Sequence, residues 1–251
     1  MRNHRHRARA TGHGDRRGAL NLGDVAGGRG LRLGEFTNTT PKPLIQIGGK
    51  PLIQILVERF AGYGLKNIWI SVHYLGSQIS DYLGDGSELG VRINYLVEES
   101  PLGTAGSYLM LPDYVRENSV IACNADLLTS VDFAELVRFH KENYAVCTMA
   151  VIEHQYQIPF GVATIEDNKL LSIQEKPLFR NYVSAGFGVF ESSAFQGFHF
   201  GEKIDATEIY KALLARGAPV ATFCVSGYWR DLGTKESLED ASKELGLGND
   251  I

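Results

Sequence analysis

The chain has 251 residues, of which 44% are hydrophobic and 22% are charged, and its formal net charge is −4. This balance is typical of one large globular domain and excludes fibrous and wholly disordered classes. No apolar run approaches the ~20 residues that a transmembrane helix needs, so we expect no membrane partner. Cys123, Cys147 and Cys224 form no C-x-x-C pair, which favours buried, reduced thiols in a cytoplasmic protein.

Positive charge is concentrated at the N-terminal end, where residues 1–19 hold six arginines against the single acidic residue Asp15. A basic segment of this kind can bind nucleic acid or direct targeting, but this one lacks an apolar core and a helical amphipathic period. We therefore expect residues 1–19 to be a disordered tail with no nucleic-acid partner. Residues 20–251 are expected to form a single domain.

Hydrophobic periodicity predicts the elements from residue 51 onwards. Residues 51–63 repeat apolar side chains with a period of about 3.6 residues behind a proline, which indicates a helix. Asp132 precedes another such pattern and is expected to be its N-cap. The strands expected in the rest of the chain are 68–72, 91–97, 119–123, 145–152, 161–166, 170–174, 182–190 and 220–225, and the helices are 76–83, 132–143, 207–216 and 234–245.

This order of elements predicts the fold class. Strands and helices alternate in the first half, which indicates an α/β fold with a doubly wound, mostly parallel mixed sheet of the Rossmann-like kind. The second half is richer in strands and predicts a smaller β-rich extension that covers the far side of the site. Ligands in such sheets bind at the carboxyl ends of the strands.

A glycine cluster near the start of the domain is the first candidate binding element. Three glycines lie within four residues and precede Arg32, which suits a loop whose N–H groups converge on a phosphate. These glycines are Gly27, Gly28 and Gly30. Lys42 stands between two prolines, so its ammonium leaves a stiff segment and can reach the same anion. The cluster matches neither a Walker loop nor the dinucleotide fingerprint and is a weak signal alone.

Further blocks follow downstream in a fixed order. They are P-L-G-T-A-G at 101–106, N-A-D at 124–126, F-G-V at 160–162, E-K-P at 175–177, A-G at 185–186 and Y-W-R-D-L-G at 228–233. With the glycine loop and P-K-P, they resemble the sugar-1-phosphate nucleotidyltransferases, and among these the mannose-1-phosphate guanylyltransferase-like proteins, over residues 25–245. Leu31 departs from the family, which usually has Thr or Ser there.

The resemblance implies a reaction between a nucleoside triphosphate and a sugar 1-phosphate, giving an NDP-sugar and pyrophosphate without a covalent intermediate. Such a reaction depends on positioning and on cations. By resemblance, Arg32 contacts the leaving pyrophosphate, Lys42 lies near the α-phosphate, and Asp126 and Asp231 hold Mg²⁺, with Asp126 counted among the catalytic residues. The nucleotide-binding half is then about 20–145 and the sugar-binding half about 146–251.

The resemblance also assigns residues to each substrate. Ala26, Gly27, Gly28, Gly30, Glu98, Pro101, Gly103 and Thr104 are expected to contact the nucleotide. Gly161, Glu175, Lys176 and Gly186 are expected to contact the sugar phosphate. A carboxylate accepts hydrogen bonds only, so Glu98 or its neighbour Glu99 suits guanine, which offers two adjacent donors, and GTP is favoured. Cytosine remains possible, and so does a solvent-exposed glutamate pair without a role.

Residues 19–25 conflict with the resemblance, which requires the central strand of the sheet there. Asn21 and Asp24 interrupt the apolar run, and burying such groups without partners is costly, so we expect an atypical N-terminal segment. This segment and Leu31 favour one alternative, a catalytically weak homologue that binds nucleotide or NDP-sugar and regulates a partner. A second alternative is a transferase specific for CTP, UTP or dTTP. A homo-oligomer is possible in each case.

Overall fold

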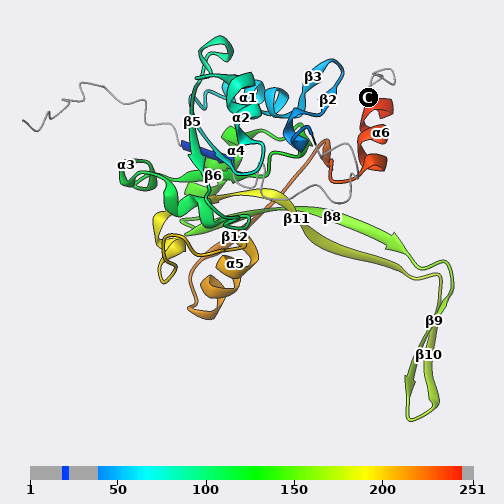
Figure 1. Cartoon of the computed structure of the whole chain (residues 1–251). Coiled ribbons are helices and arrows are strands. Elements are labelled where there is room, and N and C mark those ends of the chain that lie inside the picture. The colour runs from blue at the N-terminus through cyan, green and yellow to red at the C-terminus, as the bar shows by residue number, and fades with distance from the viewer. Residues whose placement is uncertain (1–18, 23–38, 245–251) are drawn as a thin grey trace, which may run out of the picture.

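A seven-stranded mixed sheet forms the centre of the computed structural model, which describes residues 19–22 and 39–244 (Figure 1). The strand order is β12-β8-β11-β6-β1-β4-β5. Neighbouring strands are parallel, except that β11 runs antiparallel to both β8 and β6. The predicted α/β class with a mostly parallel mixed sheet is therefore confirmed. The basic tail and the glycine loop lie outside the described residues, apart from the backbone of Ala19.

The predicted elements are present with small shifts at their ends. The strands of the large sheet are β1 (Ala19–Leu22), β4 (Asn67–Val72), β5 (Arg92–Val97), β6 (Val120–Cys123), β8 (Cys147–Gln157), β11 (Leu178–Phe190) and β12 (Val220–Cys224). Two-stranded ladders join β2 (Gln46–Ile47) to β3 (Lys50–Pro51), β7 (Leu127–Thr129) to β13 (Trp229–Asp231), and β9 (Gly161–Glu166) to β10 (Lys169–Glu175).

The α-helices are α1 (Leu52–Gly62), α2 (Gly76–Leu83), α3 (Asp113–Arg116), α4 (Phe133–Glu142), α5 (Ala206–Ala215) and α6 (Lys235–Glu244). Short 3-10 helices are η2 (Lys42–Leu44), η3 (Ser87–Leu89), η4 (Gly106–Met110) and η5 (Ser192–Phe195). The predicted cap of α4 is confirmed, because the Asp132 carboxylate accepts from the N–H groups of Ala134 and Glu135 at 2.8 and 3.1 Å. No described helix has the length and apolar character needed to cross a membrane.

The first strand bears on the expectation of an atypical N-terminal segment. The backbone of β1 pairs in parallel with β4 and with β6, and Asn21 stands opposite Trp69 on one side and Ala122 on the other. Ladder hydrogen bonds are made by backbone groups, so one polar residue does not prevent a strand from forming between two partners. β1 thus occupies the central position that the resemblance required.

Apolar side chains cover both faces of the sheet. On one face, Phe60 of α1 and Phe133 of α4 pack in a cluster with Ile121 of β6. On the other, Tyr108 of η4 belongs to a cluster with Val120, the neighbour of Ile121. Successive strand residues point to opposite faces, so β6 contributes to both clusters, as a doubly wound sheet requires.

The cysteines divide between the core and the surface. Cys123 and Cys147 are buried, and burial raises the pKa of both thiols. Cys224 is exposed, which corrects the expectation that all three would be buried. It ends the edge strand β12, where Phe223 faces the core and the next side chain points outward.

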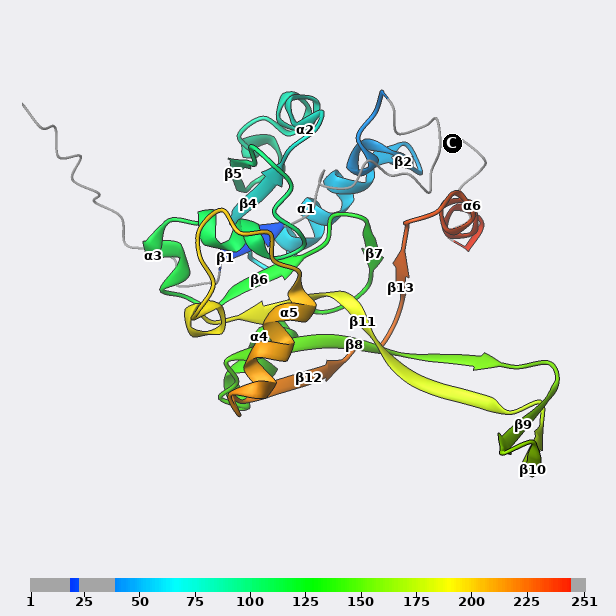
Figure 2. The ribbon, with the colours of Figure 1, turned by 60° about the horizontal axis from the view of Figure 1, so that its bottom comes forward.

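Beyond the sheet, β8 and β11 continue as a long ribbon that carries the β9–β10 hairpin at its end. We call residues 153–184 the arm. Figures 1 and 2 show the arm projecting from the body, and none of its residues is buried. The predicted β-rich extension is therefore present, but it stands away from the body. The reason is geometric, because the β8–β11 ladder runs without a register shift from Ser184 to Leu178 and holds the hairpin outward.

Candidate active site

Lys42 and Asp126 form an ion pair at the carboxyl end of β6. Lys42 opens η2 directly after Pro41, and Asp126 follows the end of β6 by three residues. The Lys42 ammonium donates a hydrogen bond to Asp126 Oδ2, and the two side chains are only 17% and 26% exposed. Charge-assisted bonds between partly buried groups are among the stronger side-chain contacts. The fold thus joins two predicted residues that are 84 positions apart in the chain.

The third predicted residue of this site, Asp231, lies at the end of β13. This strand pairs antiparallel with β7, which places Asp231 opposite Leu127, and the N–H of Leu232 donates to the carbonyl of Asp126 at 2.9 Å. A Cβ atom on Gly233 would lie 2.7 Å from Asp231 Oδ1 and 3.7 Å from Lys42 Nζ. The lysine and the two aspartates therefore gather around Gly233, where a side chain would crowd them.

The donor set of this cluster fits a hard divalent cation. Asp126 Oδ1 is buried and has no hydrogen-bond partner among the described residues, while Oδ2 is paired with Lys42. Mg²⁺ prefers one or two carboxylates together with substrate phosphate oxygens and water. In the described ranges no three His, Cys, Asp or Glu side chains group as a metal site. Asp126 and Asp231 would therefore supply only part of a coordination shell, as is usual where a substrate supplies the rest.

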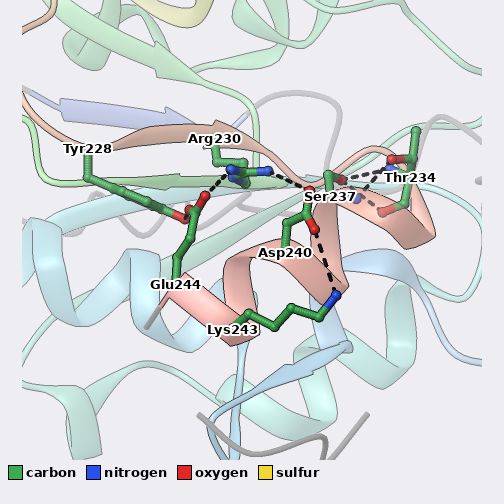
Figure 3. A network of polar contacts seen from close by, with 7 residues as sticks. All are labelled: Tyr228, Arg230, Thr234, Ser237, Asp240, Lys243 and Glu244. Carbon is green, nitrogen blue, oxygen red and sulfur yellow. Dashed lines mark hydrogen bonds and ion pairs between the residues drawn. The ribbon is translucent and has the colours of Figure 1, made fainter. Parts of the chain in front are cut away.

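Sequence reasoning missed the contacts that hold Asp231 in place. Figure 3 shows the side chain of Arg230, from β13, directed to α6: its guanidinium pairs with Asp240 at 3.4 Å and with Glu244. The Tyr228 hydroxyl donates to the same Glu244 at 3.0 Å. Neighbouring strand residues face opposite ways, so Arg230 faces α6 while Asp231 faces Lys42. The signal in the sequence is the spacing of these residues. Tyr228 and Arg230 are two positions apart and so share one face of the extended segment, while Asp231 falls on the other face.

The start of α6 is fixed by a pair of reciprocal hydrogen bonds. The Thr234 hydroxyl accepts from the N–H of Ser237 at 3.1 Å, and the Ser237 hydroxyl accepts from the N–H of Thr234 at 3.1 Å (Figure 3). Reciprocal bonds of this kind satisfy backbone donors that a helix leaves open at its first turn. They fix the first turn of α6, which follows the segment that carries Asp231 and Gly233.

Glu98 is held by hydrogen bonds inside the protein. Its side chain is 6% exposed, the Ser71 hydroxyl donates to Oε1, and the N–H of Leu102 donates to Oε2 at 2.8 Å. Both carboxylate oxygens are thus engaged within the protein. Glu98 thus braces the loop that begins at Pro101, and its contact with the nucleobase stays a prediction. Its neighbour Glu99 is exposed.

The loop at residues 101–106 is locked onto the start of α5. Gly103 has φ +76°, and a Cβ atom there would lie 2.6 Å from the carbonyl oxygen of Ile204. The N–H of Thr104 donates to Asp205 Oδ1 at 3.1 Å, and the Thr104 hydroxyl accepts from the N–H of Ala206 at 2.8 Å. Gly103 and Thr104 therefore set the distance between the loop and α5.

A cavity of about 360 Å³ opens between this loop, the end of β6, β11 and α5. Thr104, Asn124 and Gly186 line it together with Asp205 and Tyr210. Gly186 has φ +78°, and a Cβ atom there would lie 3.1 Å from Asn124 Nδ2. The cavity falls within the size range of small-molecule sites. The cavity thus brings together Thr104, which is predicted to contact the nucleotide, and Gly186, which is predicted to contact the sugar phosphate.

The remaining predicted residues lie on the arm or outside the described part of the chain. Gly161 stands opposite Glu175 in the β9–β10 ladder, and a Cβ atom on Gly161 would lie 3.3 Å from Glu175 Oε2. Lys176 follows with φ +46°. All three are exposed, and Figures 1 and 2 place their hairpin away from the body. Arg32, Ala26 and the three loop glycines lie outside the described residues.

The lysine, the two aspartates and the cavity lie at the edge of the sheet where open α/β proteins bind their ligands. The chain belongs to the nucleotidyl transferase family, whose model matches residues 25–246.

Similar proteins include several named sugar-phosphate transferases. The chain is 31% identical over 229 residues to the mannose-1-phosphate guanylyltransferase of Mycobacterium tuberculosis, covering 89% of this chain and 64% of that protein. It is 28% identical over 229 residues to the UTP–glucose-1-phosphate uridylyltransferase of Synechocystis, covering 83% and 59%. The chain thus spans less than two thirds of the length of these relatives.

Among solved structures, the chain resembles one described as a glucose-1-phosphate thymidylyltransferase from Bacillus anthracis in complex with sucrose. The TM-score is 0.70 at 25% identity, over 93% of this chain and 95% of that one. The HddC protein of Yersinia pseudotuberculosis, complexed with GMP-PN, has a TM-score of 0.67 at 19% identity, over 90% and 98% of the two chains, and supports the fold alone.

Proposed function

We propose that the chain is a sugar-1-phosphate nucleotidyltransferase. In this reaction a phosphate oxygen of the sugar 1-phosphate attacks the α-phosphorus of a nucleoside triphosphate. The bond from that phosphorus to the bridging oxygen of the β-phosphate breaks, and pyrophosphate leaves. The observation that carries the proposal is the cluster of Lys42, Asp126 and Asp231 in a member of the nucleotidyl transferase family.

Lys42 is the proposed electrostatic catalyst. Its ammonium is held by Asp126 in a site where both side chains are largely shielded from water, so it needs little reorganisation when charge develops on the α-phosphoryl group. The Asp126 and Asp231 carboxylates would hold Mg²⁺, which would supply further neutralisation of phosphate charge. Arg32 and the glycine loop, outside the described residues, are proposed to bind the triphosphate.

The cavity is the proposed site for the sugar. Thr104 and Asn124 offer polar groups at its wall, while Gly186 keeps the wall open because any side chain there would meet Asn124. The positions of Pro101 and Gly103 support a role of this loop's backbone in holding the nucleoside. Glu175 is proposed to bind sugar hydroxyls and Lys176 the sugar phosphate. Both contacts require the arm to lie against a cluster of Lys42, Asp126 and Asp231.

GTP is the nucleotide that we propose. The similarity to the mannose-1-phosphate guanylyltransferase of Mycobacterium tuberculosis supports it, and so does the exposed carboxylate of Glu99, which can accept from the two adjacent donors of guanine. Mannose 1-phosphate is the proposed acceptor on the same ground. Pyrimidine nucleotides are the alternative, supported by the similarity to the Synechocystis uridylyltransferase.

The test is pyrophosphate release from GTP, CTP, UTP and dTTP, each with mannose 1-phosphate and glucose 1-phosphate. We expect release to be fastest with GTP and mannose 1-phosphate and to be lost in Asp126→Asn. Binding of GTP in calorimetry without release from any pair would contradict the proposal and support the regulatory alternative. The pairing of β1 with β4 and β6 weighs against that alternative, which Leu31 still favours.

A further inference from the structure

We propose that the arm of each chain packs against a second copy of the chain and brings Glu175 and Lys176 to that copy's Lys42, Asp126 and Asp231. The proposal rests on the proposed function for the roles of these residues. It would make the active unit a dimer in which each site is built from two chains.

The hairpin at the end of the arm has one apolar face and one polar face. Directly paired residues of a ladder share a face, and the pairs Ile165–Leu170 and Ala163–Ile173 lie on the same one. The opposite face carries Thr164 and Ser172, whose hydroxyls are 3.0 Å apart, the pair Glu166–Lys169, and Val162 paired with Gln174. Such segregation is expected where one face of a ribbon is covered and the other meets water.

The apolar face is uncovered within a single chain. Ile165, Leu170 and Ile173 are 67%, 62% and 65% exposed. A two-stranded hairpin without a covered face is marginally stable in water. Along the whole arm, nine large apolar side chains between residues 156 and 183 are each 36–71% exposed. Three of the nine are aromatic, at about 150–250 Å² for a whole side chain, so the nine together offer several hundred Å², a substantial part of the roughly 800 Å² that one partner contributes to a standard interface.

The apolar face also carries a residue proposed to bind substrate. A Cβ atom on Gly161 would lie 3.3 Å from Glu175 Oε2 and 3.4 Å from Ile173 Cδ1, so Glu175 and Ile173 share this face. Any surface that covers the apolar face therefore also meets the Glu175 carboxylate. The surface that covers the apolar face would therefore lie beside the substrate that Glu175 is proposed to bind.

A second copy fits this requirement better than the chain's own body. The β8–β11 ladder is unbroken between Ser184 and Leu178, and it directs the hairpin away from the body in both views (Figures 1 and 2). Tyr156 and Phe179 stack across it with ring centroids 5.3 Å apart, which stiffens the ribbon. In this direction the arm does not meet its own site, but two chains related by a two-fold axis can each place an arm on the other.

The first experiment purifies a mixed dimer by two different affinity tags. One chain carries Glu175→Gln with Lys176→Met, and the other carries Asp126→Asn. Each variant alone is expected to lose pyrophosphate release by roughly 100-fold or more. If arms are exchanged, one of the two sites in the mixed dimer is built only from unchanged residues, and about half of the wild-type activity returns. Activity that stays at the level of the single variants, with an active wild type, would overturn the inference and leave the proposed function intact.

The second experiment does not depend on activity. The molar mass of the full chain is measured by sedimentation for the wild type, for Ile173→Asp and for Ser172→Asp. The two substitutions add the same charge to neighbouring positions, one on the apolar face and the other on the polar face. We expect two-chain mass for the wild type and Ser172→Asp, and single-chain mass for Ile173→Asp at the same concentration. A monomeric wild type, or a dimer that Ile173→Asp leaves intact, would overturn the inference even if no substrate pair is found.

Discussion

Replacing Lys42 by methionine tests the active site most directly, because methionine keeps most of the side-chain volume and removes the charge. In the structure the Lys42 ammonium is the only described partner of the Asp126 carboxylate, whose other oxygen is already buried without a hydrogen bond. The substitution leaves a largely shielded carboxylate unpaired. A lost charged hydrogen bond costs about 1.5–3 kcal/mol, so we expect the free energy of unfolding to fall by about that amount.

The effect on turnover should be larger than the effect on stability. Removing one donor aimed at developing charge costs about 100- to 1000-fold in kcat, and we expect a loss of that size in pyrophosphate release. Adding Asp126→Asn to Lys42→Met removes the stranded charge. The double variant should therefore recover most of the lost stability and none of the activity.

The assay combines urea unfolding of the four proteins of this cycle with steady-state pyrophosphate release and calorimetric binding of GTP. Nucleotide binding should weaken far less than kcat, because the contact strengthens as the α-phosphoryl group is transferred. If Lys42→Met kept wild-type kcat, or if the double variant were less stable than both single variants, Lys42 would be a structural residue and the reasoning would be refuted.

Three further outcomes are expected. Chelation by EDTA should abolish pyrophosphate release, as should Asp231→Asn, with unchanged circular dichroism; activity that survives chelation would argue against a metal. Gly103→Ala forces a Cβ atom to 2.6 Å from a backbone oxygen at φ +76°, so unfolding in urea should show a loss of about 1–3 kcal/mol. Hydrogen bonds from His140 and then Ser119 lower the pKa of Glu191 below its ordinary value of 4.5. Its contribution to stability is thus present above pH 4.5 and lost as the pH falls through the lower folded pKa, and Glu191→Gln should reduce this loss in unfolding curves measured from pH 7 to pH 3.

The sequence by itself determined the features that depend on neighbours along the chain. Its apolar periods predict a helix at 76–83, which has the bounds of α2, and the cap at Asp132. These features follow from the 3.6- and 2-residue periods of backbone geometry and from hydrogen bonds within one turn. The motif order also brought Lys42, Asp126 and Asp231 into one hypothesis before any contact between them was visible.

Tertiary structure alone decided how these elements meet. Glu98 accepts a hydrogen bond inside the core from Ser71, 27 positions earlier, and no local pattern encodes that pairing. Asn21 entered the central strand because two parallel neighbours satisfy its backbone. The direction of the arm was likewise hidden from the sequence. The same alternating sequence pattern is compatible with an arm that folds over its own site and with an arm that an unbroken ladder holds outward. Only the long-range pairing of β8 with β11 selects between these two directions.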